Sequence, residues 1–262
     1  FDIFLSDNYP EILNQQKNTI MISNFFWHDI LRINTEYYKK LEKKIAKRPI
    51  VSNYLFVSKY IKKNFKIKPV GFYGKFLDKN FDKKKNGILI SFGTAKLNYK
   101  TKIEINEFLE NVKSLKNKNI PIYLEPRYYQ KHYKNFNIIK ATFDNEMYSK
   151  IAIAIIKPGL GTITDCLSRG ITLITYTKNQ NKEFTENAKI LEKKNIGINF
   201  YNLISALNFS ILLIKEKSIL KEKFKIAKNL KWNGEKDVMK IINELFPQKL
   251  LIYNEKYEER LK

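Results

Sequence analysis

The sequence predicts an α/β protein built on parallel sheets, and three observations carry the prediction. Short apolar runs alternate with helical stretches along most of the chain, the pattern of β-α-β units. The run at 151–156 is apolar at every position, as expected of a strand covered by helices on both faces. Two apolar runs end in a glycine turn that precedes a helix, as in sheets that bind ligands at their carboxyl edge.

The first 74 residues predict part of one domain and a linker. Strands are expected at 1–7, 19–23 and 55–57, with a basic helix at 36–46. The segment 59–69 is a Lys-rich connector, and the Pro and Gly residues of 69–74 indicate a linker. Since a strand begins at Phe1, which is not a Met, we expect the chain to be a fragment or to lack its upstream part.

The rest of the chain predicts a more regular domain at 75–230 and a helical tail at 231–262. The expected strands are 87–93, 120–124, 138–139, 151–156, 171–176 and 196–200, and the expected helices are 103–115, 163–169 and 183–194, with two or three more near the end.

The net charge of +23 is concentrated in one part of the chain. Residues 36–86 hold 16 Lys and Arg against four Asp and Glu, so +12 of the charge falls there. Such a segment suits an anionic membrane surface or nucleic acid, or forms solvated helix faces. Nucleic acid is not the expected partner, because only five of the 49 basic residues are Arg and no recognition motif accompanies the charge.

Composition limits the class of protein in other ways. The longest apolar runs are far shorter than the roughly 20 residues of a membrane-spanning helix. The single cysteine, Cys166, excludes an internal disulfide and fits a reducing compartment, where we expect it to be a buried apolar group. No cluster of His, Cys and Asp has the spacing of metal ligands, so we expect no metal and no cofactor.

The best local pattern for a ligand site is the glycine turn after the run at 151–156. Gly159 and Gly161 allow close approach of a ligand, and Thr162 is placed to cap the helix and bond an oxygen. Asp165 is expected in the first turn, where its carboxylate can accept from a ribose hydroxyl. The same residues also fit a tight strand-to-helix turn with a Thr-to-Asp capping arrangement, so the pattern alone leaves both open.

Two more segments support a ligand site. A second glycine turn, with Gly93 and Thr94, also closes a strand and precedes a helix. The segment 183–188 opens the helix after the strand at 171–176, although a charged helix start explains its Glu183 equally well.

Together these segments resemble the nucleotide-sugar-binding half of GT-B glycosyltransferases, and most of all the family 28 and MurG-like group. The matching segments are GLGTITD at 159–165, GIT at 170–172, EFTENA at 183–188 and Gly197. The resemblance implies two Rossmann-like domains, the first incomplete, with 69–71 as the linker. It also implies a metal-independent hexosyltransferase whose donor is a nucleotide-diphosphate sugar, commonly UDP-linked.

The resemblance also implies a role for each matching residue. It places Gly159, Leu160, Gly161 and Thr162 against the diphosphate, with Gly93 and Thr94 on its other side. Asp165 would face the ribose, and Glu183 and Phe184 the sugar, whereas Asn187 would hold its helix in place. Three positions depart from the family pattern: Asp165 replaces Glu, Thr172 replaces Pro, and Phe184 replaces a Gln that bonds the sugar.

The catalytic base is not identified. In the family it commonly comes from an early loop of the first domain, upstream of Phe1. His28, followed by Asp29, is the weak candidate in the chain, and a structural role for it is preferred because neighbours on a helix do not face each other. His132 lies in a Lys- and Tyr-rich surface stretch.

We therefore expect a cytoplasmic glycosyltransferase, peripheral at the inner membrane face, acting on a saccharide or lipid-linked acceptor for cell-envelope polysaccharide. An epimerase or hydrolase of the same fold, or a donor-binding subunit that needs a partner, remains open.

Overall fold

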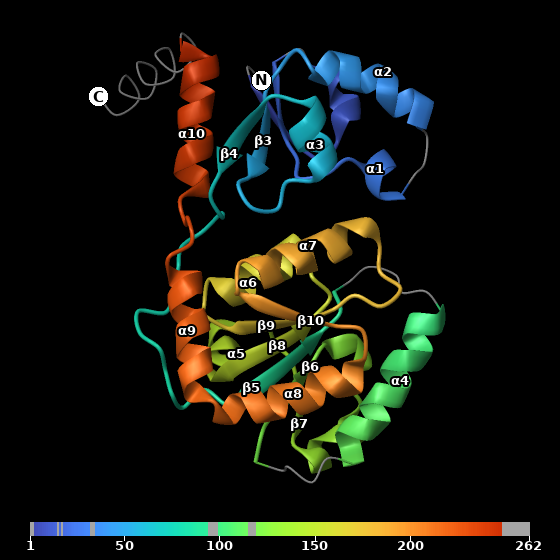
Figure 1. The fold of residues 1–262 in the computed structure, drawn as a ribbon, viewed down its shortest axis with the longest axis vertical. Helices are drawn as coiled ribbons and strands as arrows, with labels where there is room; N and C mark the ends of the chain where they lie inside the picture. Colours follow the sequence, from blue (N-terminus) through green and yellow to red (C-terminus); the bar gives the residue numbers. More distant parts are fainter. Residues whose placement is uncertain are drawn as a thin grey trace, which may run out of the picture. The chain divides into compact units, whose positions relative to one another are not determined.

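The computed structural model describes residues 3–14, 16, 18–31, 35–93, 99–114 and 119–247. The chain divides into two compact units, Phe1–Lys75 with Lys231–Lys262, and Phe76–Leu230. Each unit contains a parallel sheet with helices packed against it (Figure 1). The predicted α/β class with parallel sheets is confirmed.

The first unit contains a four-stranded sheet in the order β1-β2-β3-β4, all parallel. Its strands are β1 (Phe4–Asp7), β2 (Thr19–Ile22), β3 (Ile50–Asn53) and β4 (Ile67–Val70). Its helices are the 3-10 helix η1 (Pro10–Asn14), α1 (Trp27–Leu31), α2 (Thr35–Ile45), α3 (Lys59–Asn64) and α10 (Gly234–Leu245). Helix α10 packs on this sheet through Val238 and Ile241, which cluster with Val70, so it belongs to the first unit.

Two predictions for the first unit were wrong. Residues 55–57 form no strand, because the Asn53 side chain accepts from the N–H groups of Leu55 (3.0 Å) and Phe56 (3.3 Å) and turns the chain after β3. The apolar character of this segment reflects burial in a turn. The expected connector at 59–69 contains α3, whose first turn is capped by Ser58, and most of β4.

The second unit contains a six-stranded parallel sheet in the order β10-β9-β8-β5-β6-β7. The strands are β5 (Gly87–Ser91), β6 (Ile122–Leu124), β7 (Ile138–Lys140), β8 (Ile151–Ile156), β9 (Thr172–Tyr176) and β10 (Gly197–Phe200). The helices are α4 (Tyr99–Ser114), α5 (Asn145–Lys150), α6 (Leu160–Leu167), α7 (Lys182–Lys193), α8 (Leu203–Lys215) and α9 (Lys217–Lys228), with 3-10 helices η2 (Pro126–Tyr128) and η3 (Lys131–Phe136).

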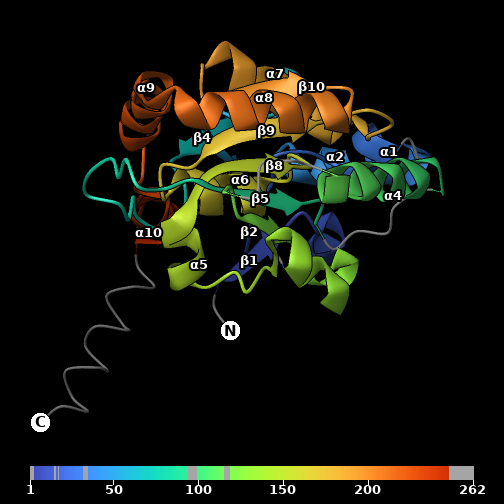
Figure 2. The same cartoon turned by 90° about the horizontal axis from the view of Figure 1, so that it is seen from below.

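Helices cover both faces of this sheet, with α6 and α7 on one side and α4 and α8 on the other (Figures 1 and 2). All six residues of β8 are buried, as the sequence predicts. Cys166 is fully buried in α6, also as predicted, and this burial raises the pKa of its thiol to about 12.

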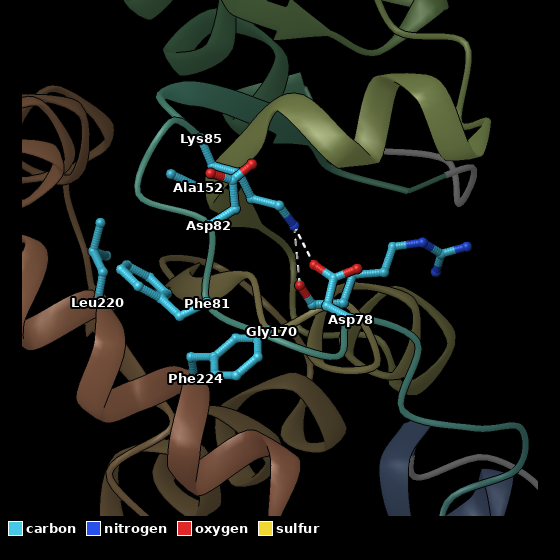
Figure 3. Close-up of a pocket in the computed structure, with 9 residues that line it drawn as sticks. Asp78, Phe81, Asp82, Lys85, Ala152, Gly170, Leu220 and Phe224 are labelled. Atoms are coloured by element: carbon cyan, nitrogen blue, oxygen red, sulfur yellow. Dashed lines mark hydrogen bonds and ion pairs between the residues drawn. The ribbon is translucent and has the colours of Figure 1, made fainter.

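The segment 76–86 has no helix or strand, yet it is anchored to the second unit. Phe81 packs against Phe224 of α9, and the ammonium of Lys85 bonds the Asp78 carboxylate and the Arg169 carbonyl (Figure 3). The cavity among these side chains measures only about 10 Å³, which is at the lower limit for a single water and too small for a larger ligand.

Candidate functional site

The order of the strands singles out one place on the six-stranded sheet. The chain runs from β5 outward through β6 to β7, then returns to β8 on the other side of β5 and continues to β9 and β10. Ligands of open parallel sheets bind at the carboxyl ends of strands at such a reversal. A pocket of about 540 Å³ lies there. It is lined from the β5 and β6 ends by Ser91, Gly93, Glu125, Pro126 and Arg127, and from the other side by Phe143, Tyr148, Thr162 and Asp165.

Helix α6 presents free backbone N–H groups beside this pocket. Its N-cap is Gly159, which has extended backbone (φ −75°, ψ 142°) and no side chain to act as a cap. Within the described residues, the N–H groups of Leu160, Gly161 and Thr162 have no acceptor in the protein. These N–H groups and the positive end of the helix dipole therefore remain available to an anion.

The start of α6 corrects two details of the sequence analysis. The helix begins at Leu160 rather than at about residue 163, so Thr162 is its third residue and not its cap. Asp165 consequently lies in the second turn, exposed, and lines the pocket. The sequence pattern missed the early start because the expected Ser, Thr or Asp cap is replaced by Gly159.

The glycine turn is held from behind by α7. The side-chain amide of Asn187, which is buried, donates to the carbonyl oxygen of Pro158 at 2.9 Å. Ile163, Cys166 and Leu167 of α6 are buried against the sheet. The turn is thus fixed by contacts that leave its pocket side open.

Lys157, which follows β8 directly, is a buried cation that the sequence analysis did not single out. Only 7% of the residue is exposed, and its ammonium lies 4.7 Å from the centre of the Phe184 ring. No hydrogen bond or ion pair of this ammonium is found among the described residues. Burial lowers its pKa, and the nearby positive charge of Arg127 lowers it further.

Glu183 and Phe184 lie in the first turn of α7, next to the glycine turn. Asn181 caps this helix by accepting from the Phe184 N–H at 3.1 Å. A Cβ on Gly159 would lie 3.7 Å from the Phe184 ring. Burial raises the pKa of the Glu183 carboxyl to about 7, although the charge of Lys157 acts in the opposite direction. The Glu183 carboxyl is therefore near its midpoint of titration at neutral pH.

Glu125 and Arg127 form the opposite wall and were also missed. The Glu125 carboxylate is buried and accepts from the backbone N–H groups of Phe92 (2.8 Å) and Gly93 (3.1 Å). Its other oxygen lies 2.7 Å from Nε of Arg127, which also donates to the Gly93 carbonyl. The one signal available in the sequence is that each residue comes shortly after an apolar strand run.

The far side of the pocket is aromatic. Phe143 is 39% exposed and adopts a left-handed backbone (φ 57°), which is costly for a residue of this size. Tyr148 lies beside it on α5, with the guanidinium of Arg169 4.3 Å from its ring. Burial raises the pKa of Tyr148, so its hydroxyl stays neutral. This wall offers apolar surface to a planar ligand.

The structure brings some of the other predicted site residues together and leaves His28 apart from them. Thr94 lies outside the described residues, whereas Gly93, Thr162 and Asp165 line one pocket. His28 lies in the first unit, buried between Phe26, Tyr38 and Tyr60. Its Nε2 lies 2.7 Å from a carboxylate oxygen of Glu42, so the observed partner is Glu42 rather than the adjacent Asp29.

In the ranges that the structure describes, His, Cys, Asp and Glu nowhere gather in a group of three or more that could hold a metal ion. None of the helices in those ranges has the length and apolar character needed to cross a membrane.

Comparison with known proteins links the architecture to glycosyltransferases. No family model and no curated protein matches the chain. Solved structures do resemble it: UGT89C1 of Arabidopsis thaliana complexed with UDP-L-rhamnose has a TM-score of 0.59 at 13% identity over 93% of this chain and 70% of that one. SsfS6 of Streptomyces sp. SF2575 complexed with thymidine diphosphate gives 0.52 at 12% over 93% and 69%. The glycotransferase of kitacinnamycin gives 0.52 at 11% over 91% and 75%.

At these identities the likeness concerns the fold. The neighbours are GT-B glycosyltransferases, and the two parallel sheets of this chain are those of the two Rossmann-like domains of that fold. The predicted GT-B fold class is confirmed.

Proposed function

We propose that this protein is a glycosyltransferase that moves a hexose from a nucleotide-diphosphate donor, a UDP-sugar, to an acceptor. The observation that carries the proposal is the pocket at the strand reversal, which Arg127 and the first turn of α6 both line, with the buried ammonium of Lys157 beside the Gly93 turn. Two of the structural neighbours are complexed with UDP-L-rhamnose and thymidine diphosphate, which supports a donor of this class.

The diphosphate is proposed to lie over the start of α6. The N–H groups of Leu160, Gly161 and Thr162 supply donors, and Lys157 and Arg127 supply positive charge. An anion near these two cations offsets both the unfavourable free energy of burying the charged Lys157 and the repulsion between the two cations. The same groups would stabilise the negative charge of the leaving diphosphate, and we propose that they do so without a metal ion.

The nucleoside is proposed to occupy the rest of the pocket. The exposed Asp165 carboxylate can accept from ribose hydroxyls, and Phe143 can pack on the face of a base. Glu183 and Phe184, beyond Gly159, are proposed to face the sugar, as the resemblance to the family 28 and MurG-like group implies.

The acceptor is proposed to be a saccharide or lipid-linked precursor at the cytoplasmic face of the inner membrane. Helix α2 supports this proposal because Lys39, Lys40, Lys43 and Lys44 are all exposed on it. Tyr37 on the same helix and Trp27 on α1 are also exposed. Exposed aromatic rings beside lysines are typical of proteins that bind anionic lipid surfaces.

Calorimetric titration of UDP into the wild type and Asp165→Ala tests the donor assignment. We expect the variant to bind UDP about tenfold more weakly, because a carboxylate bonded to ribose hydroxyls is lost. Glu110→Gln, on the exposed face of α4, is the control and should bind like the wild type. Equal binding by Asp165→Ala would refute the ribose contact.

Product analysis with a UDP-sugar tests the reaction. A glycosyltransferase forms a new glycoside only when an acceptor is added. Free sugar or an epimerised donor without acceptor would instead show the hydrolase or epimerase, and UDP binding with no product would indicate a donor-binding subunit.

A further inference from the structure

Glu125 is a buried carboxylate to which the proposed reaction assigns no task. Its side chain is 8% exposed, and it lies just past the end of β6, facing the end of β5. Oε2 accepts from the N–H of Phe92 (2.8 Å), the N–H of Gly93 (3.1 Å) and the hydroxyl of Ser91 (3.2 Å). Oε1 lies 2.7 Å from Nε of Arg127.

These contacts make the first glycine turn different from the second. Two successive N–H groups next to a residue at φ +71° form a concave nest of the kind that binds anions. Here the nest holds a carboxylate of the protein itself. A phosphate cannot use the same donors, so the role of the turn at Gly93 is to hold Glu125.

The second oxygen of Glu125 determines where Arg127 lies. The guanidinium is bonded through Nε to Glu125 and through Nη2 to the Gly93 carbonyl, so two of its three nitrogens are held and its plane is fixed. Arg127 lines the same pocket as Gly93 and Thr162. Lys157 lies near the same turn, since a Cβ on Gly93 would be 3.9 Å from its Nζ, and the charge of Arg127 helps to lower the pKa of Lys157.

We infer that Glu125 is a positioning residue of the donor site, whose carboxylate fixes Arg127 against the Gly93 turn so that the guanidinium meets the phosphates of the donor. The inference rests on the proposed donor site. It adds that binding of the phosphates depends on a side chain whose two carboxylate oxygens are already bonded within the protein.

A purely structural role would predict a different result. If Glu125 only linked the ends of β5 and β6, its replacement would destabilise the pocket and weaken the binding of all ligands alike. As a positioning residue for Arg127, it affects only the part of the ligand that carries negative charge. The two roles therefore separate when uridine is compared with UDP.

The experiment titrates UDP and uridine into the wild type, Glu125→Gln, Arg127→Gln and the double variant. We expect Glu125→Gln to weaken UDP about tenfold and to leave uridine unchanged, because its amide can accept from the turn or from Arg127 but not from both. Arg127→Gln should give the same selective loss, and the double variant should bind UDP no more weakly than either single one. Glu104→Gln is the matched control, since Glu104 pairs with Lys178 and Tyr176 at a different pocket.

Several outcomes would overturn the inference. Unchanged UDP binding by Glu125→Gln, equal losses for UDP and uridine, or additive losses in the double variant would each show that Glu125 does not act through Arg127. If Glu125→Gln does not fold, Arg127→Gln alone decides, because its retention of UDP affinity removes the role that Glu125 would support. A wild type that binds no UDP would refute the proposed donor site and the inference with it.

Discussion

Two glycine turns leave the carboxyl edge of the six-stranded sheet, one after β5 at Gly93 and the other after β8 at Gly159. Both are followed by a helix, and in sequence they look alike. In the structure, the N–H groups of the first turn are bonded to Glu125, whereas the N–H groups that follow Gly159 have no acceptor within the described residues. The first turn already holds an anion, and the second does not.

The nearby charges differ in the same way. At the first turn a carboxylate is bonded and its charge is balanced by Arg127. Between the two turns, the ammonium of Lys157 is buried without a partner among the described residues, 4.7 Å from the centre of the Phe184 ring and 3.9 Å from where a Cβ on Gly93 would lie. A glycine turn is therefore a ligand site only when the surrounding strands leave its donors and charges unsatisfied.

Replacing Lys157 tests this comparison with the largest expected effect. We expect Lys157→Met to weaken UDP about 10- to 100-fold, since a charge-assisted contact to phosphate is lost. Thermal stability at neutral pH should be equal or higher, because a cation that burial disfavours is replaced by an apolar group. Calorimetry and thermal denaturation measure the two effects.

Lys223 is a suitable control for Lys157. It is equally buried, at 6% exposure, but its ammonium bonds the side chain (3.0 Å) and the carbonyl (3.3 Å) of Asn195. Lys223→Met should lower stability and leave UDP binding unchanged. If Lys157→Met and Lys223→Met both lost stability and kept their UDP affinity, Lys157 would serve the stability of the fold and not ligand binding. The proposed difference between the two glycine turns would then be refuted.

The part of this site that could be predicted from sequence is local. The turn at 159–161 follows a strand whose apolar run identifies it, and helix periodicity places α6 and α7 within a few residues. Lys157, Glu125 and Arg127 could not be found in this way. Their proximity depends on β5 lying between β6 and β8, and sequence periodicity carries no information on strand order.

The first unit shows a second limit of the sequence. The run 55–57 has the composition of a strand, but the Asn53 side chain bonds the next N–H groups and turns the chain. The sequence offers only the adjacent Asp29 as a carboxylate partner for His28, whereas its observed partner, Glu42, comes from α2. In both cases the structure depends on a side-chain contact that the local pattern does not reveal.

Alanine at the two turns tests the comparison with a smaller effect. At Gly161 a Cβ would meet no protein atom within 4 Å, so Gly161→Ala should gain about 0.5–1 kcal/mol of stability as a helical residue. Its UDP affinity should fall about tenfold because the methyl group occupies the approach to the free N–H groups.

Gly93→Ala should behave in the opposite way. Its φ of +71° strains an alanine, so we expect a loss of about 1 kcal/mol of stability. The UDP affinity should change little, because the Gly93 N–H serves Glu125. Denaturant unfolding measures the stability of the two variants, and calorimetry measures their UDP affinity. A UDP affinity that falls more in Gly93→Ala than in Gly161→Ala would contradict the prediction.

The smallest expected effect on UDP affinity concerns the carboxyl of Glu183, which lies in the first turn of α7, next to the turn at Gly159. Burial raises its pKa from the ordinary 4.5 to about 7. A raised carboxyl pKa stabilises the native state fully below the unfolded value, and this contribution is lost as pH rises through about 7. Glu183→Gln should therefore match the wild type near pH 4.5 and become more stable than it by up to about 3 kcal/mol near pH 8.

The same titration should act on the donor. An ionised Glu183 repels the diphosphate, so wild-type UDP affinity should fall a few-fold between about pH 6 and about pH 8. Glu183→Gln should lose that part of the pH dependence, and whatever dependence remains belongs to UDP and to other groups such as Lys157. Identical pH profiles of UDP binding for the two proteins would mean that Glu183 lies too far from the phosphates to affect them. The turn at Gly159 would then bind its anion through Lys157 and the helix N–H groups alone.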